Sequence, residues 1–243
     1  MRYLVISDVH GNAPALELVL LDAPSFDALL CLGDMVGYGP NPNECISRIQ
    51  DFDLTCLAGN HDWGAVGKAD LFVFNREARQ ALQWTQEQLT EDNARFLRDL
   101  SPKLSLTDDI LICHGSPRDP VWEYLVDASS AAANFRQYEF QILLVGHSHL
   151  PLVLEWREDR EQVTALRPDL GVRLNLERRR LILNPGSVGQ PRDGNPDASY
   201  AMLDTDEMAW WFRRVAYPVE ITQERMRAQK LPRRLIARLE VGR

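Results

Sequence analysis

The feature that most constrains the fold is a series of short apolar runs, each of which ends in a small polar cluster. These runs occupy residues 3–6, 28–32, 54–58, 110–113, 142–145 and 181–183. Short continuous apolar runs fit strands that are buried on both faces. Helical stretches are expected between them, at residues 13–22, 41–50, 73–89, 93–100 and 128–138. This alternation of strand and helix predicts an α/β fold with a largely buried sheet.

The pattern changes after residue 150. Successive strands with short turns are expected at residues 152–156, 163–166, 173–176, 199–203 and 208–216, and a C-terminal helix near 219–230. The segment 157–180 is dense in arginine and glutamate, which predicts solvated hairpins. These strands suggest a second, more antiparallel sheet packed on the first. With no internal repeat and no low-complexity linker, residues 1–243 are expected to form a single domain.

Composition narrows the class of protein. No apolar run approaches the ~18 residues of a membrane-spanning helix, so no membrane partner is expected. The apolar run at residues 3–6 is too short for a signal peptide, and none of the four cysteines forms a C-x-x-C pair. A cytoplasmic location with reduced thiols is expected. The net charge of −8 argues against a long nucleic acid as partner but leaves room for a nucleotide in a small pocket.

All five histidines follow the end of a predicted strand, beside glycine, aspartate or asparagine. They are His10, His61, His114, His147 and His149. In open α/β sheets, ligands bind beyond the carboxyl ends of the strands. We therefore expect the five imidazoles to converge on one patch together with Asp8, Asp34 and Asn60.

The spacing of these residues suits metal binding. Asp8 and His10 are two residues apart, as are His147 and His149, and in an extended backbone such pairs point the same way. Each pair could therefore reach a common metal region. Mixed imidazole and carboxylate donors suit Mn, Fe, Zn or Ni rather than Ca. Cys113 precedes its neighbouring histidine by one residue and is expected to point into the core.

The motifs together resemble those of the calcineurin-like metallophosphoesterase superfamily, in particular its small bacterial and archaeal phosphodiesterase-like members. They are Asp8-Val9-His10, Gly33-Asp34, Gly59-Asn60-His61-Asp62, His114 and Gly146-His147-Ser148-His149, followed by Asn184-Pro185-Gly186-Ser187. The resemblance implies a two-sheet α/β sandwich with flanking helices and a dinuclear metal site at the carboxyl ends of the strands.

The resemblance also implies a role for each residue. One metal would be bound by Asp8, His10, Asp34 and His149, and the second by Asp34, Asn60, His114 and His147. Asp34 would bridge the two with its two carboxylate oxygens. Two cations ~3.5–4 Å apart polarise the phosphoryl group and lower the pKa of a bridging water, which attacks as hydroxide. The implied catalytic residues are Asn60 and His61, of which His61 binds no metal and protonates the leaving oxygen.

The second motif departs from that of the protein serine/threonine phosphatases. Those members read Gly-Asp-x-Val-Asp-Arg-Gly, whereas this chain has Gly37 and Tyr38 at the positions of the second aspartate and the arginine. The acid that orients the catalytic histidine and one phosphate-binding arginine are therefore missing. This favours a small phosphodiesterase or nucleotide-directed hydrolase, with Mn as the expected metal and a small phosphate ester as the expected substrate.

Other interpretations stay open. The chain could be a phosphomonoesterase or phosphoprotein phosphatase, a nuclease, or a metal-binding regulatory protein without activity. The aromatic residues that follow the motifs could stack on a leaving group or pack a lid; they are Tyr38, Trp63, Trp122 and Tyr124. Arg118 and Arg192 are candidate phosphate contacts. Trp210 and Trp211 are expected to pack in a sheet.

Overall fold

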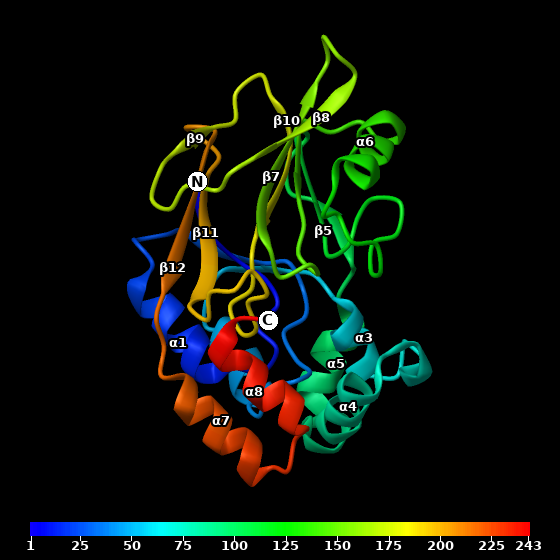
Figure 1. Cartoon of the computed structure of the whole chain (residues 1–243), viewed down its shortest axis with the longest axis vertical. Coiled ribbons are helices and arrows are strands. Elements are labelled where there is room, and N and C mark those ends of the chain that lie inside the picture. The colour runs from blue at the N-terminus through cyan, green and yellow to red at the C-terminus, as the bar shows by residue number, and fades with distance from the viewer.

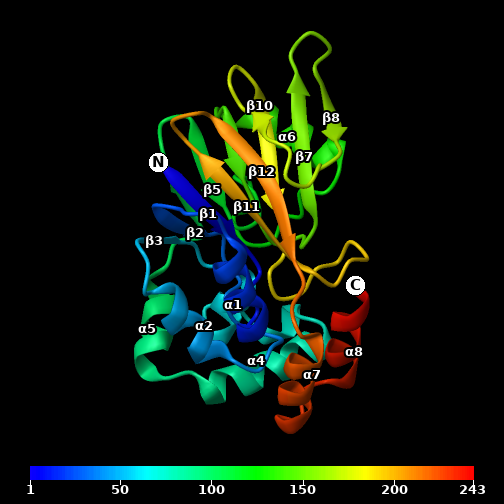
Figure 2. The same cartoon turned by 90° about the vertical axis from the view of Figure 1, so that its left-hand side faces the viewer.

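A computed structural model describes residues 1–243, and its strands form two mixed sheets (Figures 1 and 2). The first sheet has the order β3-β2-β1-β11-β12-β9 and the second β4-β5-β6-β10-β7-β8. The strands are β1 (Arg2–Ile6), β2 (Ala28–Cys31), β3 (Leu54–Cys56), β4 (Lys103–Ser105), β5 (Ile110–Cys113), β6 (Ile142–Leu144), β7 (Pro151–Arg157), β8 (Gln162–Leu166), β9 (Leu174–Asn175), β10 (Arg180–Pro185), β11 (Ala198–Asp204) and β12 (Ala209–Val215).

Helices cover the outer faces of both sheets. They are α1 (Ala13–Asp22), α2 (Pro42–Ile49), α3 (Asn60–Ala65), α4 (Arg76–Gln88), α5 (Glu91–Asp99), α6 (Ala128–Gln137), α7 (Val219–Ala228) and α8 (Arg233–Val241), with a 3-10 turn η1 at Leu71–Val73. In both views α4, α5, α7 and α8 lie at the lower end of the molecule, whereas α6 packs on β7 and β8 of the second sheet. None of these helices is long and apolar enough to cross a membrane.

The apolar strands are buried on both faces, as their sequences predict. Tyr3 and Val5 of β1 join a core between the two sheets, whereas Leu4 and Ile6 face the helices. This alternation follows from the two-residue period of a strand. Trp210 lies in the core between the sheets and Trp211 in the core under the helices. The predicted two-sheet α/β sandwich with flanking helices is therefore confirmed.

The expectation that the strands after residue 150 form a separate antiparallel sheet was wrong. Strands β11, β12 and β9 extend the first sheet, because β11 pairs antiparallel with β1. Strands β10, β7 and β8 extend the second sheet, in which β10 lies parallel to β6. These pairings give hydrogen-bond partners to the backbone N–H and C=O groups at the otherwise open edges of β1 and β6. Apolar patterns identify strands, but they do not encode which edges pair.

Two helices were not predicted. The segment 60–65, expected to be a polar cluster after a strand, forms the short helix α3. The C-terminal helix expected near 219–230 is followed by a second helix, α8, whose residues Leu235, Ile236 and Leu239 are buried. Pro232 precedes α8, and Gly242 ends it in a left-handed conformation with φ 61°. Both residues are recognisable boundary signals for a helix.

Candidate metal centre

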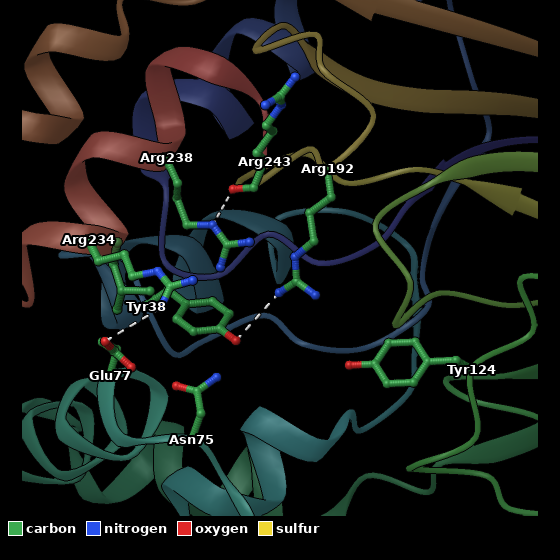
Figure 3. Close-up of a pocket in the computed structure, with 9 residues that line it drawn as sticks. Tyr38, Asn75, Glu77, Tyr124, Arg192, Arg234, Arg238 and Arg243 are labelled. Carbon is green, nitrogen blue, oxygen red and sulfur yellow. Dashed lines mark hydrogen bonds and ion pairs between the residues drawn. The ribbon is translucent and has the colours of Figure 1, made fainter.

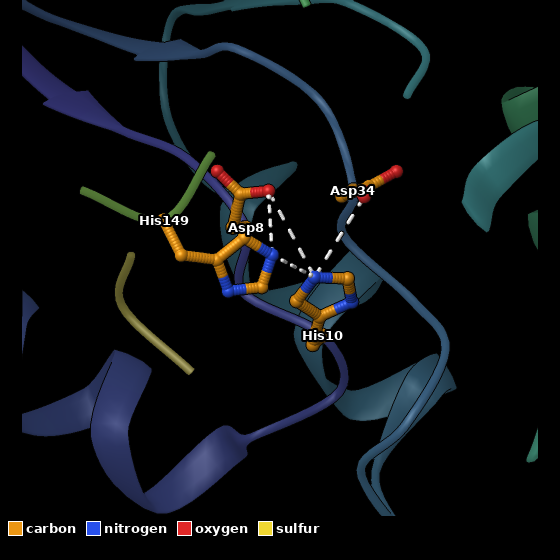
Figure 4. A group of neighbouring side chains, drawn as sticks. All are labelled: Asp8, His10, Asp34 and His149. Carbon is orange, nitrogen blue, oxygen red and sulfur yellow. Dashed lines mark hydrogen bonds and ion pairs between the residues drawn. The ribbon is translucent and has the colours of Figure 1, made fainter. Parts of the chain in front are cut away.

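The proposed metal ligands come together where strands of both sheets end. Asp8 follows β1, Asp34 follows β2, His114 follows β5, and His147 and His149 follow β6. All of these side chains are buried. They form two groups that share Asp34, and within each group the ligand atoms lie within 4.8 Å of one another. The groups are Asp8, His10, Asp34 and His149 (Figure 4), and Asp34, His114 and His147.

In the first group, nitrogen and oxygen lone pairs face one another. Nδ1 of His10 donates to the Val36 carbonyl over 3.1 Å, and Nδ1 of His149 donates to the Gln190 carbonyl over 2.6 Å. Because a carbonyl can only accept, each ring carries its proton on Nδ1, and Nε2 of the neutral ring is an acceptor. These two Nε2 atoms are 3.1 Å apart, and Nε2 of His149 is 3.2 Å from Oδ1 of Asp8. Acceptors held this close together without a donor fit a cation between them.

The second group is oriented in the same way. Nδ1 of His114 donates to the Leu32 carbonyl over 2.8 Å, so its Nε2 faces Oδ2 of Asp34 at 3.4 Å. Oδ1 of Asn60 lies 3.3 Å from the same Nε2 atom. His147 is reversed, since its Nε2 donates to the Trp122 carbonyl over 3.2 Å and Nδ1 is left as the acceptor. Backbone partners of this kind fix which nitrogen a histidine offers to a metal.

The two carboxylates each keep one oxygen without a hydrogen bond. These buried atoms are Oδ1 of Asp8 and Oδ2 of Asp34. The other oxygens are occupied: Oδ2 of Asp8 accepts from Ser7 Oγ at 2.6 Å, and Oδ1 of Asp34 accepts from the backbone N–H of His61 at 2.8 Å. An unpaired buried carboxylate oxygen is costly unless a cation binds it. Oδ2 of Asp34 lies 3.7 Å from Nε2 of His10 and 3.4 Å from Nε2 of His114, so a single oxygen faces both groups, and bridging by Asp34 stays a prediction.

Burial and mutual charge shift the pKa values of the whole cluster. Burial raises the pKa of Asp8 to about 7, and the neighbouring charge of Asp34 contributes to the rise. Burial opposes ionisation of Asp34 too, but the surrounding imidazoles, His114 foremost, hold the pKa of Asp34 below its usual range. Although burial disfavours its charged form, Asp34 raises the pKa of His114 to about 9. Burial lowers the pKa of His61 to about 4 and that of His147 to about 3. The neutral imidazole of His147 is suited to metal ligation.

The backbone of the ligand pairs is left-handed, so the prediction of an extended backbone was wrong. The φ angles are 53° at Asp8 and 48° at His10, and 62° at His147 and 59° at His149. Asp34 also has a positive φ, of 54°. Such conformations cost of order 1–3 kcal/mol each in a residue with a side chain, and they persist at functional sites where the surrounding structure imposes them.

His61 lies beside the first group without belonging to either. It is the second residue of α3 and not part of an extended segment, and successive helical residues are rotated by about 100°. Asn60 therefore faces His114 while the imidazole of His61 lies among aromatic rings. Its ring centroid is 4.3 Å from that of Tyr38, 4.8 Å from that of His10 and 5.1 Å from that of Phe74.

The contact between Gly37 and His61 explains the departure from the protein phosphatase motif. A Cβ atom at residue 37 would lie 2.5 Å from Nδ1 of His61, and Gly37 has a φ of 86°. An aspartate at this position would require His61 to move. No other acid takes its place, because Nδ1 of His61 is buried without a hydrogen-bond partner.

Asp62 is a positioning residue, a role that the sequence did not predict. Its Oδ2 accepts hydrogen bonds from the backbone N–H groups of Asp34, over 2.8 Å, and Gly59, over 2.9 Å. Its Oδ1 accepts from the N–H of Val36 over 3.1 Å. This carboxylate therefore ties the start of α3 to the loop that carries Asp34. An acidic residue three positions after the residue that caps a helix is a recognisable sequence signal.

The remaining aromatic and basic candidates separate into two sets. Tyr124 stacks on His147 with centroids 3.9 Å apart, and Nη2 of Arg192 lies 3.4 Å from the hydroxyl of Tyr38, so all three residues border the site. Arg118 is instead paired with Glu123, which neutralises its charge. The carbonyl of Trp122 accepts a hydrogen bond from His147 and so orients that proposed ligand. Trp63 lies near Lys68, with the ammonium 6.0 Å from the ring centroid.

Comparison with known proteins places the chain in a family. Residues 1–208 match the family model described as the calcineurin-like phosphoesterase superfamily domain. The chain belongs to that superfamily. It is 37% identical to an uncharacterized protein of Methanocaldococcus jannaschii, over 98% of this chain and 97% of that protein. It is 26% identical to phosphodiesterase YfcE of Escherichia coli K12, over 86% of this chain and 90% of the relative.

A solved structure agrees with this assignment. The metallophosphoesterase from Sphaerobacter thermophilus superimposes with a TM-score of 0.91 and is 40% identical, covering 100% of this chain and 99% of that one. This calcineurin-like phosphoesterase is accordingly a hydrolase of phosphate esters with a candidate dinuclear metal site. Helices α7 and α8 lie beyond the residues that the family model matches.

Proposed function

We propose that this phosphoesterase is a metal-dependent phosphodiesterase that acts on a small substrate with two divalent cations. The observation that carries the proposal is the first ligand group, in which Nε2 of His10, Nε2 of His149 and Oδ1 of Asp8 converge without a proton donor. In the second group, oxygen atoms of Asp34 and Asn60 likewise lie close to Nε2 of His114 and could bind a metal with it. Mixed imidazole and carboxylate donors favour Mn, with Fe, Zn or Ni as alternatives.

The reaction is the hydrolysis of a diester to a monoester and an alcohol. Two bound cations would neutralise the phosphate and help to generate the nucleophile from water. Water loses one proton to the solvent as its oxygen forms a bond to phosphorus, and the bond from phosphorus to the leaving oxygen breaks. His61 supplies the proton that the leaving oxygen requires. Burial keeps this imidazole neutral in the free protein, with a pKa of about 4, and the negative phosphate beside it would favour its protonated form.

Preference for a diester is supported by the residues around His61. A monoester dianion requires more positive charge than a diester anion, and the protein phosphatase arginine is replaced by Tyr38. The ring of Tyr38 packs instead against the rings of His10 and His61, which leaves an aromatic wall beside the site. The relative YfcE is itself named a phosphodiesterase. A phosphomonoesterase or a silent regulatory protein are the alternatives that the experiment separates.

The test uses metal-stripped protein reconstituted with one cation at a time. We expect kcat/KM to be higher for bis-p-nitrophenyl phosphate than for p-nitrophenyl phosphate or a phosphoserine peptide, with Mn the most effective cation. The metal-free protein is the control and should be inactive. A clear preference for the phosphopeptide would overturn the diester assignment. A protein that binds metal and hydrolyses none of the three would favour the alternative of a silent regulatory protein.

A further inference from the structure

A cavity of about 550 Å³ is lined by the residues drawn in Figure 3, and it lies beside the candidate metal centre. Three of its lining residues touch the proposed ligands or His61. The ring of Tyr38 packs against His10 and His61, the ring of Tyr124 stacks on His147, and the backbone N–H of Arg192 donates to the His149 carbonyl. A substrate phosphate at the metal centre would therefore have its ester groups at the mouth of this cavity.

The cavity is strongly positive in a protein of net charge −8. Four arginines line it, and Glu77 is the only acidic side chain among the lining residues; the arginines are Arg192, Arg234, Arg238 and Arg243. Glu77 lies 4.0 Å from Nη1 of Arg234, the limit of an ion pair. The polar side-chain partners of Arg192 are neutral: the hydroxyl of Tyr38 and Oε1 of Gln190, at 3.4 and 3.1 Å.

Arg238 has no carboxylate side chain as a partner. Its Nε donates to the main-chain oxygen of Arg243. Burial lowers the pKa of Arg238, and the neighbouring charge of Arg192 lowers it further. Bringing several guanidinium groups together costs free energy, and an anion bound between them would recover it.

Helix α8 supplies two of these arginines from a fixed position. Arg234 and Arg238 are four residues apart and therefore lie on the same face of the helix. The helix is anchored by the buried side chains of Leu235, Ile236 and Leu239, of which Leu235 also lines the cavity. This helix lies outside the residues matched by the family model, so the arginines add to the common phosphoesterase site and are not part of its metal-binding motifs.

We infer that the cavity binds a second phosphate of the substrate, so that the enzyme acts on phosphodiesters carrying a further phosphate on one esterified group. The inference rests on the proposed function, because it places the scissile phosphate at the metal centre. Guanidinium forks bind phosphate oxygens in pairs, which suits a phosphate better than a neutral sugar. Tyr38 and Tyr124 would flank the group that links the two phosphates.

A matched pair of chromogenic substrates tests this inference. Thymidine 5′-(p-nitrophenyl phosphate) has only the scissile diester, and the same compound with a 3′-phosphate carries the additional anion. At constant ionic strength we expect the 3′-phosphorylated compound to have a kcat/KM about ten- to hundredfold higher, the range expected from charge-assisted hydrogen bonds. Equal values for the two substrates would overturn the inference while leaving the phosphodiesterase assignment intact.

Substitutions on α8 localise the effect. Arg238→Gln and the more exposed Arg234→Gln should each reduce the preference for the 3′-phosphorylated compound by about tenfold or more. Arg233→Gln is the matched control, because Arg233 is exposed on the same helix and does not line the cavity. The control should keep the preference of the unmodified protein. An equal loss in all three variants would contradict a local phosphate site.

Binding provides a readout that does not depend on turnover. Calorimetry with the Mn-loaded protein should show tighter binding of thymidine 3′,5′-bisphosphate than of thymidine 5′-phosphate, with the difference reduced in Arg238→Gln and retained in Arg233→Gln. If neither diester is hydrolysed but this difference is observed, the phosphodiesterase proposal fails and the second phosphate site stands. Equal binding of the two nucleotides would reject the site.

Discussion

The variant His61→Ala tests whether His61 is a proton donor or a metal ligand. The side chain is buried, but its Nδ1 has no hydrogen-bond partner, so His61→Ala breaks no hydrogen bond from that atom. The loss is packing against the rings of Tyr38, His10 and Phe74. We expect a decrease in the free energy of unfolding of about 1–3 kcal/mol, the usual range for a single substitution, and retention of both metals.

The catalytic effect should depend on the leaving group. A positioned acid contributes about 10²–10⁴-fold, so His61→Ala should lose that much kcat for a diester with an alkyl alcohol as leaving group. This loss corresponds to about 3–5 kcal/mol of the activation barrier. A nitrophenolate leaving group hardly needs a proton, and the loss should shrink to about tenfold or less.

The assay compares methyl p-nitrophenyl phosphate with a dialkyl phosphate under saturating Mn, with the metal content measured by elemental analysis. His114→Ala is the matched control, because His114 is a proposed ligand and its removal should lower both metal content and rate for every substrate. Loss of metal in His61→Ala would make His61 a ligand. An equal rate loss for both leaving groups would refute the role of proton donor.

Two further substitutions test the geometry of the site. Asp34→Asn removes the charge of the oxygen that faces both ligand groups, so metal content should fall and turnover should be lost; an active variant that keeps two tightly bound metals would disprove bridging by Asp34. Gly37→Ala places a Cβ atom 2.5 Å from Nδ1 of His61 at a φ of 86°, which should lower the free energy of unfolding by about 1–3 kcal/mol in urea denaturation. An unchanged urea midpoint would show that His61 can move without cost.

Much of the fold could be predicted from the sequence because strands and helices leave a local pattern. Strands β1, β2, β5 and β6 coincide with apolar runs, and a polar cluster follows each of them. Both patterns involve only residues that are adjacent in the sequence. Helix α1 begins and ends at the predicted residues, with Asn12 as its cap. The five histidines could be grouped in advance, because the carboxyl ends of parallel strands lie at one edge of a sheet.

Other features depended on contacts between distant segments, which local patterns do not encode. The pairing of β11 with β1 joins residues about two hundred positions apart, and backbone hydrogen bonding of this kind is insensitive to side-chain identity. For example, the backbone N–H of His61 donates to Oδ1 of Asp34, which leaves Oδ2 free to bind a metal.

What the sequence by itself determined is therefore every strand except β4, most helices and the residues able to ligate a metal, since each depends on neighbours along the chain. Only the tertiary structure decided the orientation of each imidazole, which is fixed by carbonyls such as those of Val36 and Gln190. It also decided that Arg192 and two arginines of α8 surround one cavity. In the sequence these arginines are indistinguishable from exposed ones, because the positive potential arises only when the fold brings them together.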